Sequence, residues 1–333
     1  MNAELAHYSD LAYHSAVAVY VLAAVLLACE LASSSTRKVE ARDQAREQAR
    51  GRSSLVSVGG PAAAAPIVGP GRVTAPRSRP LSDRLGRMGA ALVGLGLALH
   101  VSSIVLRGLS ADRAPWGNMY EFVSLFTAVA VAGLLVMMRN HAVRPLSAFV
   151  LLPVVVLMFV GGTVLYARSA PVVPALQSYW LIIHVSVICV ASGVLLVSGV
   201  ASALFLLRRR HPEGAEAPGA VGALAARLPG AQTLDRVAYR TAIFAFPLFT
   251  VGVILGAIWA EAAWGRYWGW DPKEVAAFVT WVVYAAYLHA RATAGWRNTR
   301  AAWVNVAGTA VVLFNLFFIN IVVSGLHSYA GLN

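Results

Sequence analysis

Eight long apolar runs, separated by more polar segments, constrain the fold of this chain more than any other feature of its sequence. A helix that crosses a bilayer needs about 20 mainly apolar residues, because its backbone polar groups must be bonded within the segment. The eight runs are 13–33, 88–106, 120–138, 147–166, 179–207, 239–260, 272–290 and 302–325. Hydrophobic residues make up 58% of the chain and charged residues 13%, against about 25% charged in soluble proteins. The sequence therefore predicts an all-α, polytopic membrane helix bundle of about eight transmembrane helices.

The basic residues predict how this bundle is oriented. The net charge of +12 would suit a nucleic-acid-binding protein, but the Lys and Arg residues lie between the apolar runs rather than in one patch. With residues 34–87 placed in the cytoplasm, 22 of the 27 Lys and Arg residues fall on the cytoplasmic side. Because cytoplasmic loops carry the excess of Lys and Arg, both termini and the tryptophan-rich outer loop 259–274 are predicted to be extracytoplasmic.

The same pattern divides the chain into three regions. Residues 1–33 are predicted to be an N-terminal transmembrane anchor, since the first residues have none of the positive charge of a cleavable signal peptide. Residues 34–87 form a basic, Pro/Gly/Ala-rich cytoplasmic linker, in which 36–50 is suited to a short charged helix. Residues 88–333 contain the remaining seven spans and form the expected functional domain.

A dense tryptophan cluster lies ahead of the seventh run. Residues 264–274 read Trp-Gly-Arg-Tyr-Trp-Gly-Trp-Asp-Pro-Lys-Glu, so that Trp264, Trp268 and Trp270 stand within seven positions. The alternative to a binding role is an ordinary aromatic belt at the membrane interface. Belt tryptophans are usually scattered, however, whereas this cluster offers a flat platform that two glycines allow to fold over a ligand. Together with histidines at the rims of nearby spans, the platform indicates a flat, iron-bearing ligand, haem.

The charged residues of this loop have local roles of their own. Asp271 is a favoured N-cap, Pro272 fits the first helical position, and Glu274 is placed to close a capping box. Arg266 and Lys273 are expected to pair with the anionic propionates of a haem. The alternative for both is a solvated charge at the rim of the site.

Two histidines are predicted to lie at the depth of the tryptophan loop. His184 stands five residues into the fifth run, one helical turn after Trp180, and His327 follows the last run. Either one alone is as well explained by packing, but two at equal depth beside the aromatic loop suit the axial ligands of a haem iron.

Two further histidines lie inside spans. His289 stands 17 residues past Pro272, about 26 Å along the helix, near the cytoplasmic boundary. It is a candidate ligand of a separate inner haem iron, or else a snorkelling interfacial residue. His100, in the second run, is a further candidate ligand or a packing residue, and the sequence does not decide between these roles.

These residues resemble a known family. The 264–274 segment looks like the tryptophan-rich signature (the WWD motif) of haem-handling membrane proteins of cytochrome c assembly. The resemblance is strongest to the CcsA/ResC branch of system II cytochrome c biogenesis, sometimes labelled CcsB in bacteria. It covers about 88–330 and is supported by four further segments: 115–122, Tyr179-Trp180 with His184, 289–291 and 325–330.

The resemblance implies specific roles for three histidines. In similar proteins the positions of His184 and His327 hold the outer haem between them, and the position of His289 belongs to an inner site. The resemblance also implies haem b as the transported substrate, a ResB/Ccs1-type membrane partner, and CxxCH apocytochrome c as the acceptor of thioether-linked haem. The chain would then be the haem-handling subunit of a two-protein cytochrome c synthase (haem lyase) in the bacterial cell membrane.

Three alternatives are less well supported by the residues. A b-type haem protein that transfers electrons would have ligand pairs at matched depth within the bundle, and here only the outer pair matches. A small-molecule transporter would usually show repeated halves and broken helices, and the sequence has neither. A haem-delivery protein of the multi-component pathway would have six spans and lack the extra N-terminal segment.

Overall fold

The computed structural model describes the backbone of residues 2–55, 81–139, 143–296 and 298–327, and their side chains except those of 34–55 and 175. This part of the chain is helical and without strands, as the sequence predicts. The helices are α1 (Ala3–Leu55), α2 (Leu81–Ala111), α3 (Met119–Met138), α4 (Ser147–Thr163), α5 (Tyr179–Arg210), α6 (Ala220–Arg227), α7 (Ala231–Trp264), α8 (Pro272–Ala292) and α9 (Thr299–Ile321), with short 3₁₀ turns η1 (Arg144–Leu146) and η2 (Pro174–Leu176).

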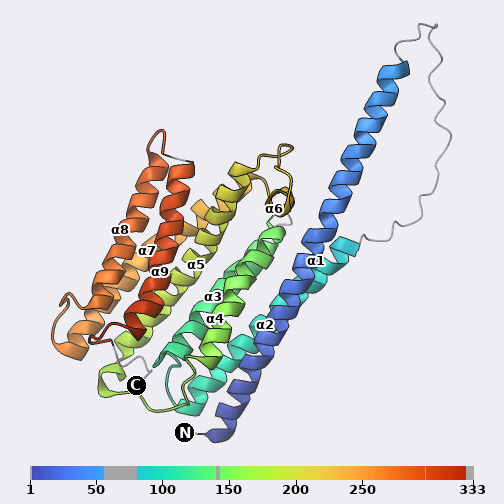
Figure 1. Ribbon diagram of the computed structural model, residues 1–333. Coiled ribbons are helices and arrows are strands. Elements are labelled where there is room, and N and C mark those ends of the chain that lie inside the picture. Colours follow the sequence, from blue (N-terminus) through green and yellow to red (C-terminus); the bar gives the residue numbers. More distant parts are fainter. Residues whose placement is uncertain (1, 56–80, 140–142, 297, 328–333) are drawn as a thin grey trace, which may run out of the picture.

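Eight of the described helices are long and apolar enough to cross a membrane, which confirms the predicted multi-pass bundle. The eight long helices of the described residues run roughly along one direction (Figure 1). The start of α1, the α7–α8 loop and the end of α9 lie at the same end of the bundle (Figure 1). We call this the tryptophan end. The short helix α6 lies at the opposite end.

The first helix starts ten residues earlier than predicted. Its N-terminus is capped by the Asn2 side chain, which accepts hydrogen bonds from the backbone N–H groups of Glu4 and Leu5. Two polar residues of its first turns, Ser9 and Asp10, contact neighbouring segments. The Ser9 hydroxyl donates to the Ser103 backbone oxygen at 2.8 Å, and Asp10 accepts a bond from the Tyr166 hydroxyl. Polar residues with such partners are compatible with a span, which hydropathy alone does not reveal.

The region predicted as a linker is partly helical. Helix α1 continues without a break to Leu55, so the charged stretch 36–50 prolongs the first helix instead of forming a separate one. Residues 81–87 belong to α2. The central part of the predicted linker, 56–80, lies outside the described residues.

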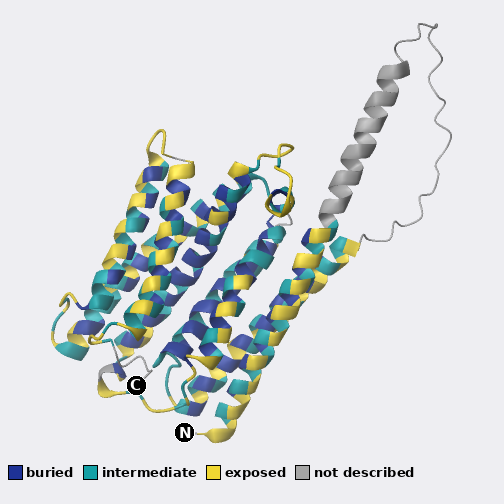
Figure 2. Cartoon of the chain, in the orientation of Figure 1, coloured by how far each residue is buried: buried dark blue, intermediate teal, exposed yellow. Residues whose placement is uncertain are grey.

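Helices α3 and α5 form the centre of the bundle. In each of them 56% of the most apolar 18-residue window is buried, against 22% in α7 and α9 (Figure 2). Helix α5 packs on α3, α7 and α9, and so joins an N-terminal group, α1–α4, to a C-terminal group, α7–α9. Polar contacts reinforce this packing, because the buried Asn305 of α9 donates to the hydroxyls of Ser198 and Ser202 of α5, both at 2.8 Å.

A buried ion cluster braces the tryptophan end of the N-terminal group. Glu121, at the start of α3, accepts hydrogen bonds from Arg107 of α2 and from Arg113 of the following loop. It also accepts a bond from the Gly117 backbone N–H at 2.8 Å. The Arg107 guanidinium in addition lies 3.6 Å from Asp10 of α1. The cluster therefore fixes the loop between α2 and α3, which forms one wall of the site described next.

Candidate ligand-binding site at the tryptophan loop

A cavity opens among α3, α5, α7, α8 and α9 at the tryptophan end; we call it the tryptophan cavity. It holds about 1260 Å³ of space free of protein atoms, counting the part that is open to the outside. The walls are mainly apolar and aromatic, and they include His184, His327 and Lys273. Its deeper part is lined by apolar residues together with Ser192 and Thr280.

The end of α7 shapes the mouth of the cavity. Helix α7 ends at Trp264 and is capped by Gly265, which adopts the left-handed conformation (φ 69°) that glycine takes without strain. Of the three predicted platform indoles, Trp264 and Trp268 line the cavity. Trp270 does not, since 68% of it is exposed and its backbone has a φ of 57°, which is rare for a bulky residue. The ring of Trp270 instead meets Trp268 edge to face.

The predicted helix cap at the start of α8 is confirmed. Asp271 accepts a hydrogen bond from the Lys273 backbone N–H, and Glu274 accepts one from the Asp271 backbone N–H at 3.1 Å. Glu274 also accepts a bond from the Gly269 N–H at 2.8 Å, so the capping box extends into the tryptophan loop. The loop is thus held to the helix that follows it.

His184 is fixed in a notch of α7 formed by two glycines. Its Nδ1 donates a hydrogen bond to the backbone oxygen of Gly252 at 2.8 Å. A Cβ atom at Gly256 would lie only 2.8 Å from His184 Cε1, so that position must be glycine for the imidazole to fit. The imidazole is nearly parallel to the Trp259 indole, with ring centres 6.1 Å apart.

His327 is fixed by the capping residue of α8. Its Nδ1 donates to Asp271 Oδ2 at 2.7 Å, and the Leu326 N–H donates to Asp271 Oδ1 at 2.8 Å. The approach is close, because a Cβ at Gly325 would meet Asp271 at 2.8 Å. Burial by itself would raise the pKa of Asp271, but the hydrogen bonds from His327 and Leu326 outweigh it and lower that pKa to about 2.

Trp259 lies close to both imidazoles. Its ring centre lies 6.1 Å from that of His184 and 5.7 Å from that of His327. Only 2% of Trp259 is exposed, and it lines the tryptophan cavity. The sequence predicted Trp259 at the start of the outer loop 259–274 and indicated no role for it. That boundary was wrong, because α7 continues to Trp264 and Trp259 is a buried residue of the helix.

Lys273 and Arg266, which were both expected to pair with haem propionates, lie in different surroundings. Lys273 lines the cavity, and its ammonium contacts the Asn315 backbone oxygen at 3.4 Å. Arg266 is not among the cavity-lining residues and lies 3.5 Å from Glu274.

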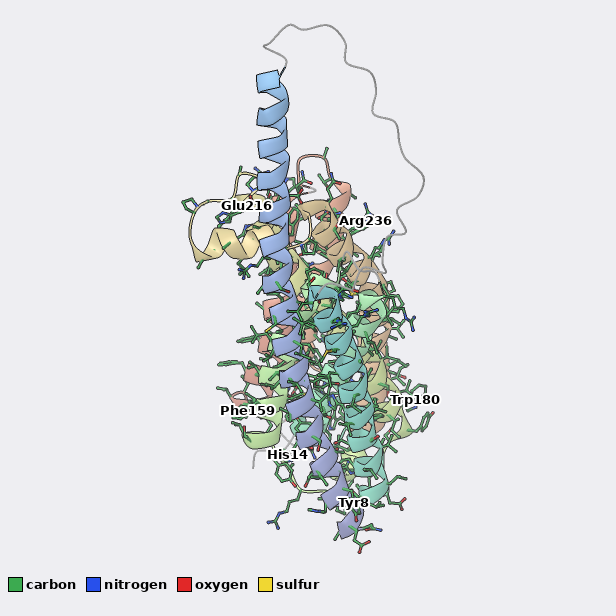
Figure 3. All side chains as sticks on the ribbon, turned by 90° about the vertical axis from the view of Figure 1, so that its right-hand side faces the viewer. Tyr8, His14, Phe159, Trp180, Glu216 and Arg236 are labelled. Atoms are coloured by element: carbon green, nitrogen blue, oxygen red, sulfur yellow. The ribbon has the colours of Figure 1, made fainter. Side chains whose placement is uncertain are left out.

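Three other predicted residues lie away from the cavity walls. Trp180 packs beside Tyr179, with ring centres 4.8 Å apart, at the edge of the bundle (Figure 3). His289 is exposed near the far end of α8. His100 is completely buried in α2, with Nε2 3.0 Å from the Ser124 hydroxyl and Nδ1 3.5 Å from that of Tyr20.

The described residues contain no group of three or more His, Cys, Asp or Glu side chains that could hold a bare metal ion. The tryptophan cavity instead offers two imidazoles within a large aromatic enclosure. When Nδ1 of a neutral imidazole carries the proton, Nε2 carries the lone pair that binds a metal. Hydrogen bonds from Nδ1 to a carboxylate or a backbone carbonyl are the usual second partners of metal-binding histidines. The arrangement therefore suits a metal whose remaining ligands come from a flat, apolar organic group.

The chain matches one protein family and several known proteins. Residues 116–327 match the model of a family described as cytochrome C assembly protein. The cytochrome c biogenesis protein CcsA of Parasynechococcus marenigrum is 36% identical over 265 residues, which cover 72% of this chain and 85% of that protein. The CcsA of Gloeobacter violaceus is 34% identical over 307 residues, and the match covers 77% of this chain and 89% of that protein.

A solved structure titled cytochrome c haem lyase CcmF resembles the fold. The TM-score is 0.58 at 14% sequence identity, and the match covers 99% of this chain and 51% of that one. This chain thus spans about half the length of the solved protein, and the likeness concerns the arrangement of the helices.

Proposed function

Since this chain belongs to the cytochrome c assembly protein family, we propose that its tryptophan cavity binds haem and presents it to apocytochrome c. His184 and His327 are the proposed axial ligands of the haem iron. One observation carries this proposal: two imidazoles from separate segments each lie near Trp259 in the tryptophan cavity, and each directs Nδ1 to an oxygen acceptor. That arrangement leaves Nε2 of each neutral ring as the nitrogen suited to bind iron.

The walls of the cavity support haem as the substrate. Trp259, Trp264 and Trp268 provide apolar, flat surface for a porphyrin, and Trp264 lies edge to face with His327 at 5.1 Å. Because haem is the substrate that the chain passes on, these residues act by binding, orienting and excluding water. Bound haem supplies the iron and the vinyl groups to which the two thiols of a CxxCH motif add in forming thioether bonds.

The route of haem to this site involves the opposite end of the bundle. We propose that His289 is a ligand of an inner haem iron that receives haem from the cytoplasmic side. His289 stands about 26 Å along α8 from Pro272, too far to share a ligand with the tryptophan cavity. The tryptophan end would then face the extracytoplasmic side of a bacterial cell membrane, as the excess of Lys and Arg at the other end favours.

The proposed substrate is haem b, and the proposed partner is a ResB/Ccs1-type membrane protein. Trp270 fits a contact with an acceptor or partner, because its indole is exposed beside the mouth of the cavity. The three-part division of the chain, with the functional domain in 88–333, belongs to the same proposal.

The direct test is the absorption spectrum of the purified protein, prepared with its partner and loaded with haem. His184→Ala and His327→Ala should each lose the low-spin signal of haem with two imidazole ligands, and added imidazole should restore it. The control is His14→Ala, which removes an exposed imidazole of α1 away from the cavity. His289→Ala should lower the loading of the tryptophan cavity while leaving its ligands intact. Unchanged spectra in both ligand variants would refute the assignment.

A further inference from the structure

Lys273, which is half-buried, differs from the largely buried arginines in the described parts of the chain. Five arginines are largely buried, and each lies within 4.0 Å of at least one carboxylate: Arg107, Arg113, Arg144, Arg208 and Arg291. Among the described residues, no carboxylate lies as close to the ammonium of Lys273. Its contacts are the Asn315 backbone oxygen at 3.4 Å and the Phe122 ring, whose centre is 6.0 Å away.

An unpaired ammonium in such a place is energetically costly. Removing a charge from water is compensated only by close opposite charge and several hydrogen bonds. One carbonyl at 3.4 Å is a weak acceptor for a group with three N–H bonds. Lys273 faces the tryptophan cavity, so the missing acceptors would come from whatever fills it.

A second donor in the same cavity lacks an acceptor. The indole Nε1 of Trp116 is buried and has no hydrogen-bond partner in the described part of the structure. An indole N–H can only donate. Trp116 and Phe122 pack against the same apolar cluster, and Phe122 also meets Lys273. Phe122 is thus a shared neighbour of the two donors, which come from the α2–α3 loop and from α8.

The wall that carries Trp116 is rigid. Glu121 binds the Gly117 N–H and the Arg113 guanidinium, and Asn118 caps α3 by accepting a bond from the Glu121 N–H. The Trp116 N–H is therefore held in place before any ligand arrives, which reduces the entropic cost of binding.

We propose that Lys273 and Trp116 form a carboxylate-binding end of the tryptophan cavity and receive a propionate of the bound porphyrin. The inference rests on the proposed function and adds the orientation of the substrate. Arg266 is not part of this end, because it does not line the cavity and lies 3.5 Å from the carboxylate of Glu274. In haem b the vinyl groups lie on the edge away from the propionates. Holding a propionate at Lys273 and Trp116 therefore leaves the reactive edge of the macrocycle for the acceptor thiols.

The buried side-chain oxygen of Asn315 is compatible with this arrangement. It has no donor among the described residues and belongs to the residue whose backbone oxygen Lys273 contacts. A water molecule held by the bound carboxylate can donate to this oxygen, so a ligand with an ionised carboxyl group is compatible with both kinds of unpaired group here.

The test compares the affinity of haem with that of its dimethyl ester, in which both propionates are uncharged. Each is titrated into the full-length protein, purified with its partner, and binding is followed by the absorption of the bound haem. The wild-type protein should bind haem at least about tenfold more tightly than the ester, which is the range of one charge-assisted hydrogen bond. Lys273→Met should remove most of this preference while leaving the affinity for the ester unchanged. Trp116→Phe should reduce the preference by a smaller factor.

Arg266→Gln is the matched control, since it removes a loop cation that is paired elsewhere; it should keep the wild-type preference. Equal affinities of the wild-type protein for the two porphyrins, or an unchanged preference in Lys273→Met, would overturn the carboxylate-binding end alone. Absence of haem binding, or wild-type spectra in both ligand variants, would instead overturn the proposed function on which it rests.

Discussion

Asp271→Asn separates the two functions of the residue that joins α8 to the proposed iron ligand. Asp271 caps α8 through the Lys273 N–H, and it accepts bonds from His327 Nδ1 at 2.7 Å and from the Leu326 N–H at 2.8 Å. Asn is as good an N-cap as Asp, so the helix should be retained. Its amide group has only one oxygen, however, and its NH₂ group would face one of the two donors. His327 therefore loses a charge-assisted partner or a fixed position.

The magnitude follows from the kind of bond that is lost. A hydrogen bond to a charged group contributes about 1.5–3 kcal/mol, and one between neutral groups about 1 kcal/mol. Mutations of residues that orient a metal ligand typically weaken metal binding by about 10–100-fold. We therefore expect Asp271→Asn to bind haem about 10–100-fold more weakly than the wild-type protein. The reduction potential of the bound haem should rise, because a carboxylate partner makes imidazole a stronger ligand for ferric iron.

The assay is a haem titration of the purified protein together with a potentiometric titration. Glu274→Gln is the control, because it weakens the capping box but leaves the bond between His327 and Asp271 in place. Its haem affinity should stay within about threefold of the wild-type value, the effect of a single neutral contact. An affinity of Asp271→Asn within twofold of the wild type, or equal losses in the two variants, would refute the reasoning.

Three further predictions concern the surroundings of the proposed ligands. Gly256→Ala should displace the His184 imidazole, which would meet the new Cβ at 2.8 Å, and so weaken the low-spin haem signal; Gly133→Ala, where a Cβ meets nothing within 4 Å, should have no effect on the spectrum. Glu121→Gln leaves two buried guanidinium groups without their shared carboxylate and should destabilise the protein by about 3–5 kcal/mol, measured as a lower thermal transition; no change would contradict the role of the ion cluster as a brace. The pKa of Asp271 is lowered from 3.8 to about 2, so its stabilising contribution is complete above about pH 4 and is lost only as the pH falls toward 2. Haem titrations at pH 7 and pH 5 should therefore show the same change of affinity in the wild-type protein and in Asp271→Asn; a change in the wild type that disappears in the variant would contradict this.

The features that depend on nearby sequence were predictable. Eight apolar runs gave the spans, because length and hydropathy decide whether a helix can cross a bilayer. The Asp271–Glu274 capping box was predictable for the same reason, since all its atoms lie within one turn of helix. The equal depth of His184 and His327 followed from counting residues from the ends of their spans, and both line the tryptophan cavity.

The direction in which individual side chains point was not predictable. Trp270 looked equivalent to Trp264 and Trp268, but its left-handed backbone turns the indole outward. Trp180 and His184 stand one turn apart on α5, yet only His184 lines the cavity, because the packing of α5 against α7 decides which part of that face is enclosed. These outcomes depend on contacts between segments that are distant in the sequence.

The partners of charged side chains were equally hidden. Arg266 and Lys273 looked alike, but Arg266 meets Glu274 while Lys273 enters the cavity. Asp271 was expected chiefly as a cap, and its bond to His327 joins positions 56 residues apart. No local pattern reports a contact of that separation.

The most direct measurement is an experimental structure of the haem-loaded protein with its partner, at a resolution that places the iron and both imidazoles. We expect the porphyrin beside Trp259, with Nε2 of His184 and Nε2 of His327 each at about 2 Å from the iron, the usual length of a bond between a metal and imidazole nitrogen. An iron atom ligated by only one of these histidines, or a porphyrin bound outside the tryptophan cavity, would contradict the central claim.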